Sequence, residues 1–124
     1  MKIIETDNAP KAIGTYSQAV KVNGFLFISG QIPLNPSTME LVEGIENQIN
    51  QVFENINEIL KADGMDFSNV VKLSVLLEDL SHFEKVNEIM AVLFSKPYPA
   101  RAAYEVSKLP KGSLVEIETI AFKE

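Results

Sequence analysis

An Asn-Gly pair between two apolar runs is the feature that most constrains this fold. Asn23 and Gly24 separate residues 19–22 from residues 25–29. A tight two-residue hairpin turn needs positive φ angles, which asparagine and glycine adopt more readily than other residues. The pattern therefore predicts an antiparallel hairpin near the start of the chain. Two prolines in the next segment, residues 31–36, predict a loop after the second strand.

Two later segments have the periodicity of amphipathic helices. Apolar side chains in residues 44–63 recur every three or four positions and trace one helical face, and Gly64 follows where a left-handed C-terminal cap is expected. A second helix is predicted to begin at Ser81, whose spacing to Glu84 is that of a capping box, and to end before Pro97. In the first helix a series of asparagines is expected to face solvent: Asn47, Asn50, Asn55 and Asn57.

Three more strands complete the expected order of elements. They are predicted at residues 70–77, 103–106 and 115–122. The order β-β-α-β-α-β-β predicts an α+β fold, a single domain over residues 1–124 in which two helices pack on one face of a mixed sheet. The strands predicted at residues 25–29 and 70–77 are apolar on both faces, so the other sheet face also needs a cover. We therefore expect a homo-oligomer assembled sheet to sheet.

Composition narrows the functional classes. The chain has 11 basic and 17 acidic residues, a net charge of −6, and no basic run, so no nucleic-acid partner is expected. It has no cysteine and one histidine, His82, in the helix-start signature, where a capping or surface role is expected. No metal or other cofactor is expected. No apolar stretch approaches the roughly 20 residues of a membrane span, and residues 1–20 lack a secretory signal, so we expect a cytoplasmic protein without membrane contact.

Arg101 is the only arginine in the chain. It follows two prolines in an expected loop, and its planar guanidinium can grip a carboxylate through two parallel hydrogen bonds, which a lysine cannot do. The residue is equally consistent with a carboxylate-binding site and with an ordinary surface salt bridge.

Glu116 and Glu118 lie two residues apart on a predicted strand and therefore on the same face. Carboxylates beside large apolar groups have raised pKa values, which suits proton transfer. The alternative is a solvated strand end. A glycosidase pair is poorly supported, because the chain has no tryptophan to form a sugar platform.

Ser29 and Gly30 end the first long strand, where a glycine lets a ligand approach the backbone closely. Tyr16 offers a phenolic hydrogen bond, either to a ligand or, as a buried loop residue, to the backbone.

A set of short motifs, taken together and in order, resembles the Rid/YjgF family, and specifically its reactive intermediate deaminase A branch. The motifs are Ala9-Pro-Lys-Ala-Ile-Gly-Thr-Tyr-Ser-Gln-Ala19, Ser29-Gly-Gln-Ile-Pro33, Asn69-Val-Val-Lys72, Leu80 with Phe83 and Val86-Asn87, Pro99-Ala-Arg101, Leu109-Pro110, and Val115-Glu-Ile-Glu118 with Ile120-Ala121. The resemblance covers almost the whole chain.

This resemblance implies a chorismate-mutase-like fold and a homotrimer whose sheets form a central barrel, with active sites in the clefts between subunits. The implied reaction, without a cofactor, is hydrolysis of 2-iminobutanoate, 2-iminopropanoate and their enamine tautomers to 2-oxo acids and ammonia. It removes reactive intermediates that leak from enzymes using pyridoxal phosphate.

The resemblance also implies roles for individual residues. Arg101 would bind the substrate carboxylate and Glu116 would activate the attacking water. The remaining pocket contacts would come from Tyr16, Gly30, Ser29, Asn87 and the backbone near Ala103. The chain has Ala103 where many members have cysteine and Thr15 where many have proline. Because the family role at Ala103 is largely a backbone role, deaminase activity is expected to survive.

Three alternatives stand beside the deaminase. The first is a non-catalytic protein of the same fold that binds a metabolite carboxylate. The second is a translation inhibitor or endoribonuclease, against which the acidic balance and the single arginine argue. The third is a chorismate mutase, whose dicarboxylate substrate would need more cationic contacts than one arginine supplies.

Overall fold

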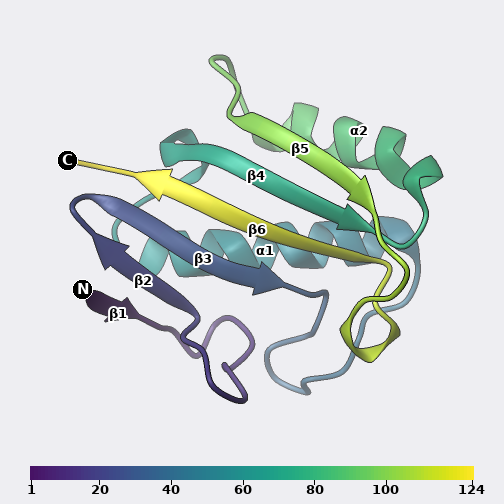
Figure 1. The fold of residues 1–124 in the computed structure, drawn as a ribbon, viewed down its shortest axis with the longest axis horizontal. Helices are drawn as coiled ribbons and strands as arrows, with labels where there is room; N and C mark the ends of the chain where they lie inside the picture. Colours follow the sequence, from purple (N-terminus) through teal and green to yellow (C-terminus); the bar gives the residue numbers. More distant parts are fainter.

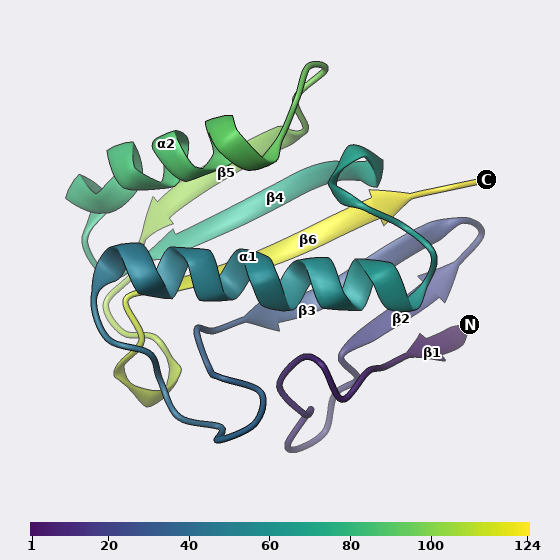
Figure 2. The same ribbon diagram turned by 180° about the vertical axis from the view of Figure 1, so that it is seen from behind.

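The computed structural model, which describes residues 1–124, contains one six-stranded sheet in the order β1-β2-β3-β6-β4-β5. Its elements are β1 (Lys2–Ile4), β2 (Ala19–Val22), β3 (Phe25–Gln31), α1 (Ile45–Ala62), β4 (Val70–Leu77), α2 (Phe83–Leu93), β5 (Ala100–Glu105) and β6 (Val115–Phe122). Neighbouring strands are antiparallel except β4 and β5, which run parallel. Both helices cover the same face of the sheet (Figure 2). The predicted α+β architecture, a mixed sheet with two helices on one face, is confirmed.

The predicted hairpin forms at Asn23 and Gly24. Their φ angles are 49° and 84°, and Val22 pairs with Phe25 across the turn. β3 runs two residues beyond the predicted end. The short strand β1, which pairs with β2, was not predicted, because three residues are too few to show a period-two pattern.

The two helices differ in how well the sequence located their ends. α1 matches the prediction, and Gly64 adopts the expected left-handed backbone with φ of 69°. The prediction of a capping box at Ser81 was wrong. Asp79 turns the chain instead: its carboxylate accepts a hydrogen bond of 2.9 Å from the Ser81 backbone N–H and starts a short 3₁₀ turn. α2 therefore begins only at Phe83, and His82 provides no side-chain cap.

β5 begins three residues earlier than predicted, so Arg101 lies in a strand rather than in a loop. Lys72 of β4 pairs with Ala100 and Leu73 pairs with Arg101, both in parallel register. Alanine-rich segments have low strand propensity, and here pairing with the neighbouring strand overrides it.

The core lies between the helices and the sheet, and the opposite sheet face is uncovered. A single cluster of 23 buried apolar residues fills the space under α1 and α2. On the other face, which Figure 1 shows toward the viewer, Phe25 and Phe27 are 40% and 42% exposed. No helix of the structure is both long enough and apolar enough to cross a membrane.

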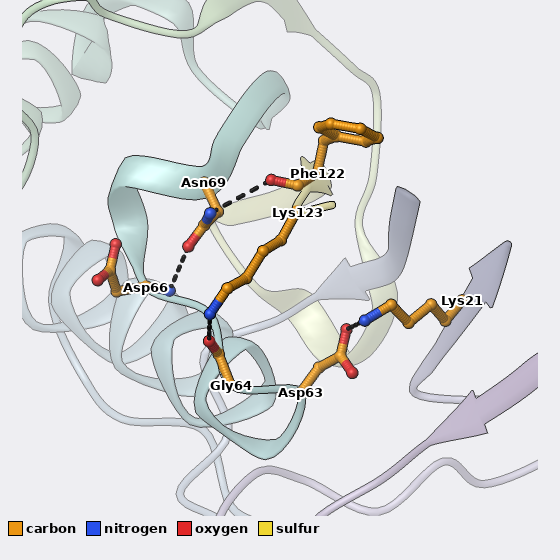
Figure 3. A network of polar contacts seen from close by, with 7 residues as sticks. All are labelled: Lys21, Asp63, Gly64, Asp66, Asn69, Phe122 and Lys123. Atoms are coloured by element: carbon orange, nitrogen blue, oxygen red, sulfur yellow. Dashed lines mark hydrogen bonds and ion pairs between the residues drawn. The ribbon is translucent and has the colours of Figure 1, made fainter. Parts of the chain in front are cut away.

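Polar contacts tie the C-terminal end of α1 to two parts of the sheet (Figure 3). Asp63, just after α1, forms an ion pair of 2.8 Å with Lys21 of β2. Lys123, just after β6, donates a 2.7 Å hydrogen bond to the carbonyl of Gly64. A cation at the carbonyl end of a helix interacts favourably with the helix dipole. These contacts fix where α1 lies across the sheet.

Asn55 is fully buried, which corrects the prediction that the helix asparagines all face solvent. Its Nδ2 donates a 3.0 Å hydrogen bond to the carbonyl of Leu34, and its Oδ1 accepts one of 2.9 Å from Gln51. The loop between β3 and α1 packs against α1 at this point, so the polar side chain meets a backbone group instead of water.

Replacing Asn55 by leucine should lower the free energy of unfolding by about 1–3 kcal/mol, because the Leu34 carbonyl then stays buried without a hydrogen bond. Denaturant unfolding of the variant and the parent measures the change. The matched control is Asn50→Leu on the exposed face of α1, which should stay within about 0.5 kcal/mol of the parent. Equal effects in the two variants would contradict the role of the Asn55 hydrogen bond.

Candidate functional site

A cavity opens on the uncovered sheet face, beside the ends of β3 and β6. It has a volume of about 1080 Å³. Its lining includes five of the residues singled out in the sequence: Tyr16, Ser29, Gly30, Glu116 and Glu118. Most concave sites that bind small molecules combine apolar walls with a few polar groups, as here.

Glu116 is held against the backbone of Gly30. The pairing of β3 with β6 shifts register between Ile28 and Gln31, and Gly30 lies inside this irregular stretch. A Cβ atom added at Gly30 would overlap the Glu116 carboxylate. The φ angle of Gly30 is outside the left-handed region, so the glycine is needed here for space and not for backbone conformation.

The environment of Glu116 raises the pKa of its carboxyl group. Half-burial of the side chain is the main cause, because burial disfavours the charged form, and the negative charge of Glu118 on the same face adds to it. Groups with raised pKa values accept and release protons more readily near neutral pH. Glu116 is thus suited to proton transfer in a way that a fully solvated carboxylate is not.

A buried glutamine holds the loop that carries Tyr16. The Oε1 of Gln18 accepts a 2.8 Å hydrogen bond from the Thr6 backbone N–H, and its Nε2 donates to the carbonyl of Pro10 at 2.8 Å. The same nitrogen also lies within hydrogen-bond distance of the carbonyls of Thr6 and Ala9. One side chain, only 4% exposed, thus fastens the N-terminal loop to β2.

Tyr16 extends from this loop into the rim of the cavity. The alternative of a buried tyrosine was wrong, since the residue is 53% exposed. Its hydroxyl accepts a 3.3 Å hydrogen bond from the Ile13 N–H and keeps its own proton available for donation. Ser29 joins this loop to β3, because its Oγ donates a 2.6 Å hydrogen bond to the carbonyl of Ser17.

Another buried glutamine fastens the loops on the other side of the cavity. Nε2 of Gln48, in α1, donates to the carbonyl of Val42 at 3.0 Å, and its Oε1 accepts from the Leu114 N–H at 2.8 Å. Together with the Asn55 contact, these bonds attach both the loop before α1 and the loop before β6 to the same helix. Lys111, in the second of these loops, lines the cavity.

Arg101 lies elsewhere, on the helix-facing side of the edge strand β5. Its Nη1 donates a 2.6 Å hydrogen bond to Oδ1 of Asn87, and its guanidinium carbon lies 4.6 Å from the centre of the Phe83 ring. Nη1 is also 3.5 Å from the sulfur of Met90. A smaller cavity of about 350 Å³ adjoins the arginine. Ala103 is two residues further along β5, on the same side.

The chain therefore does not bring all of the predicted site residues together. Glu116 is on the uncovered face of β6, whereas Arg101 is on the helix-facing side of β5. Two strand spacings, roughly 10 Å, separate β6 from β5. The predicted residues form an acidic half-site, made of Tyr16, Ser29, Gly30 and Glu116, and a cationic half-site, made of Arg101, Asn87 and Ala103.

Sequence analysis assigned no role in the site to Gln18 or Phe83, which support these half-sites. Gln18 gave no periodic signal, and only the fold shows that its amide is buried. Phe83 precedes Asn87 by four residues, a spacing that places both on one helical face, so the pattern contained a signal for its position. No cluster of three or more His, Cys, Asp or Glu side chains is arranged to hold a metal ion.

Comparison with known proteins identifies related chains. The sequence pattern of the family described as Endoribonuclease L-PSP matches residues 6–123. The mouse 2-iminobutanoate/2-iminopropanoate deaminase is 54% identical over 121 residues, which cover 97% of this chain and 90% of the mouse protein. A RutC family protein of Pyrococcus horikoshii is 53% identical over 124 residues, 99% of this chain and 98% of that protein.

Solved structures share the fold closely. The crystal structure of RidA from the Antarctic bacterium Psychrobacter has a TM-score of 0.96 and 53% identity, covering 99% of this chain and 100% of that one. Escherichia coli TdcF, solved with bound serine, has a TM-score of 0.95 and 38% identity over the full length of both chains.

Replacing Glu118 by glutamine should lower the pKa of Glu116, because the variant removes the neighbouring negative charge that disfavours ionisation. Following the Glu116 side-chain carboxyl carbon by NMR during a pH titration measures the shift. Glu84→Gln, the same substitution on the exposed surface of α2, is the control and should leave this titration unchanged. An unaltered Glu116 titration in Glu118→Gln would contradict the coupling.

Proposed function

Since the chain belongs to the endoribonuclease L-PSP family, which includes the Rid proteins, we propose that it is a deaminase of short-chain 2-imino acids. Its substrates are 2-iminobutanoate, 2-iminopropanoate and their enamine tautomers, and its products are 2-oxo acids and ammonia. The observation that carries the proposal is the half-buried Glu116 carboxylate, with its raised pKa, packed over Gly30 in the main cavity. Curated relatives named for this reaction, at 51–54% identity, support the same reaction here.

The chemistry requires little more than a positioned water and a proton carrier. The carbon of a protonated imine is already electrophilic, so it needs neither a covalent nucleophile nor a redox step. Glu116 accepts a proton as the water oxygen bonds to the imine carbon, which gives a carbinolamine. The carboxyl group then protonates the amino nitrogen and the C–N bond breaks. Ammonia leaves as the hydroxyl passes its proton to the Glu116 carboxylate, which gives the 2-oxo acid, and Glu116 then releases this proton to solvent.

Arg101 binds the substrate carboxylate. Its planar fork of donors forms two parallel hydrogen bonds with a carboxylate and fixes the orientation of the imine carbon relative to Glu116. Tyr16 donates its hydroxyl proton to the substrate, and the backbone at Ser29 and Gly30 lines the opposite wall. Asn87 and Ala103 contribute from the side of Arg101.

The separation of the half-sites implies that two copies share each active site. A short 2-imino acid cannot reach from Glu116 to Arg101 of the same chain, because the two side chains lie on opposite faces of the sheet and two strands apart. The uncovered face is also apolar and carries exposed Phe25 and Phe27. We infer a homotrimer in which the β5 edge of one copy brings Arg101 to the cavity of the next.

A second function, binding of an amino-acid-like carboxylate without turnover, is favoured by one specific observation. The related TdcF was solved with bound serine, which carries a carboxylate but no imine. The same Arg101 half-site serves this alternative. RNA cleavage, which the family description suggests, fits less well with a net charge of −6 and a single arginine.

Arg101→Lys should lower kcat/KM for imine hydrolysis by roughly 10- to 100-fold, because lysine keeps the charge but loses the paired donors. Imines generated by an amino-acid oxidase, with semicarbazide competing for them, report turnover as a faster loss of trappable imine. The control Lys85→Ala removes the positive charge of a partly exposed lysine of α2 that pairs with Glu88, and it should retain activity. Full activity of Arg101→Lys would refute the carboxylate role. No turnover by the parent, with retained binding of 2-oxobutanoate, would favour the binding function.

Mixing two inactive variants tests the shared site. Arg101→Ala lacks the guanidinium and Glu116→Gln lacks the proton carrier. After the subunits of a 1:1 mixture exchange, about a quarter of the shared sites combine an intact Arg101 with an intact Glu116. The mixture should therefore regain about a quarter of the parent activity. Native mass spectrometry verifies the exchange and the number of chains per assembly. Absence of any recovery after verified exchange would place both residues in the same chain's site.

A further inference from the structure

Phe83, Asn87 and Met90 form one side of α2 and face the edge strand β5. They are spaced at i, i+4 and i+7, which aligns them along a single helical face. Each contacts the guanidinium of Arg101. The centre of the Phe83 ring lies 4.6 Å from the guanidinium carbon, and the Asn87 amide oxygen and the Met90 sulfur lie 2.6 Å and 3.5 Å from Nη1. No other helix residue forms a hydrogen bond or a cation–π contact with this guanidinium.

These contacts leave most N–H donors of the Arg101 guanidinium unused. Asn87 uses only Nη1, and the Phe83 ring occupies the region beside the guanidinium carbon without consuming a donor. The remaining N–H groups are available to a carboxylate. Arg101 is otherwise an exposed side chain with many rotamers, and fixing those rotamers on binding costs conformational entropy.

We propose that Phe83 is a positioning residue for Arg101, whose ring holds the guanidinium in the orientation that binds the substrate carboxylate. The inference deepens the proposed function and rests on it. A cation over an aromatic ring is attracted by the negative face of the ring, and this contact limits rotation about the arginine side chain without competing for its hydrogen bonds. Phe83 acts through Arg101 and contacts neither the substrate nor Glu116.

Because Arg101 is the only arginine, its side-chain NMR signal can be followed directly to test the proposal. Because the chain has no other arginine, the ¹⁵N spectrum contains one arginine Nε–Hε signal, which needs no assignment. Protons above an aromatic face are shifted upfield by the ring current. Phe83→Leu should move this signal toward the value of a free arginine side chain, whereas Phe83→Tyr, which keeps the ring, should retain it.

Ligand binding and turnover supply the second readout. Phe83→Leu should weaken 2-oxobutanoate binding, and raise KM for the imine, by about two- to five-fold, with a smaller change in kcat. Phe83→Tyr should restore both values. The matched control is Phe67→Leu, because Phe67 is likewise a partly buried phenylalanine packed on the core but has no contact with Arg101.

The outcomes separate this inference from the proposed function. Equal weakening of binding in Phe83→Leu and Phe67→Leu, or an unmoved arginine signal in Phe83→Leu, would refute the positioning role. A parent protein that binds 2-oxobutanoate but hydrolyses no imine refutes the deaminase and leaves the positioning role to be decided by the same spectra and binding constants. If the parent binds no carboxylate at all, both proposals fail.

Discussion

Buried carboxamide side chains attach the walls of the cavity to the rest of the fold. Gln18 holds the N-terminal loop, Gln48 and Asn55 hold the loop before α1, and Gln48 also holds the loop before β6. Buried backbone groups must find hydrogen-bond partners, and irregular loops cannot supply them to themselves as helices and strands do. An amide offers a donor and an acceptor without a charge to desolvate, so it can do this inside the core. The position of Tyr16, and the shape of the cavity around Glu116, depend on these contacts.

Within one chain, Glu116 and Arg101 lie on opposite faces of the sheet, and this separation explains the raised pKa of Glu116. An arginine beside Glu116 in the same chain would favour the ionised carboxylate and lower its pKa. With Arg101 two strands away on the other face, burial and Glu118 determine the pKa instead, and both raise it. The cation meanwhile has uncharged partners, Asn87 and Phe83, which orient it without neutralising it. Within a single chain, therefore, neither Glu116 nor Arg101 is paired with a group of opposite charge.

The sequence predicted the features that depend on local pattern. The hairpin at Asn23 and Gly24, the span of α1 and the shared face of Glu116 and Glu118 follow from turn chemistry and periodicity, and the structure has all three. The features that were missed depend on tertiary contacts. Asn55 is polar and lies among other asparagines, so only the loop packed against it reveals that it is buried. Residues 100–102 have low strand propensity and become a strand because β4 provides the hydrogen-bonding partner. The split of the site between faces likewise required the strand order, which no short motif contains.

The close packing of Glu116 on Gly30 couples the side chains that these two positions can hold. Any larger residue at position 30 would displace the carboxylate, so a substitution there is tolerated only by a chain that no longer needs the acid in this place. Conversely, a chain that has lost Glu116 is released from the requirement for glycine and is free to fill the space with a side chain. Relatives that keep the fold but lack a carboxylate at position 116 should therefore often carry a larger residue at position 30 as well.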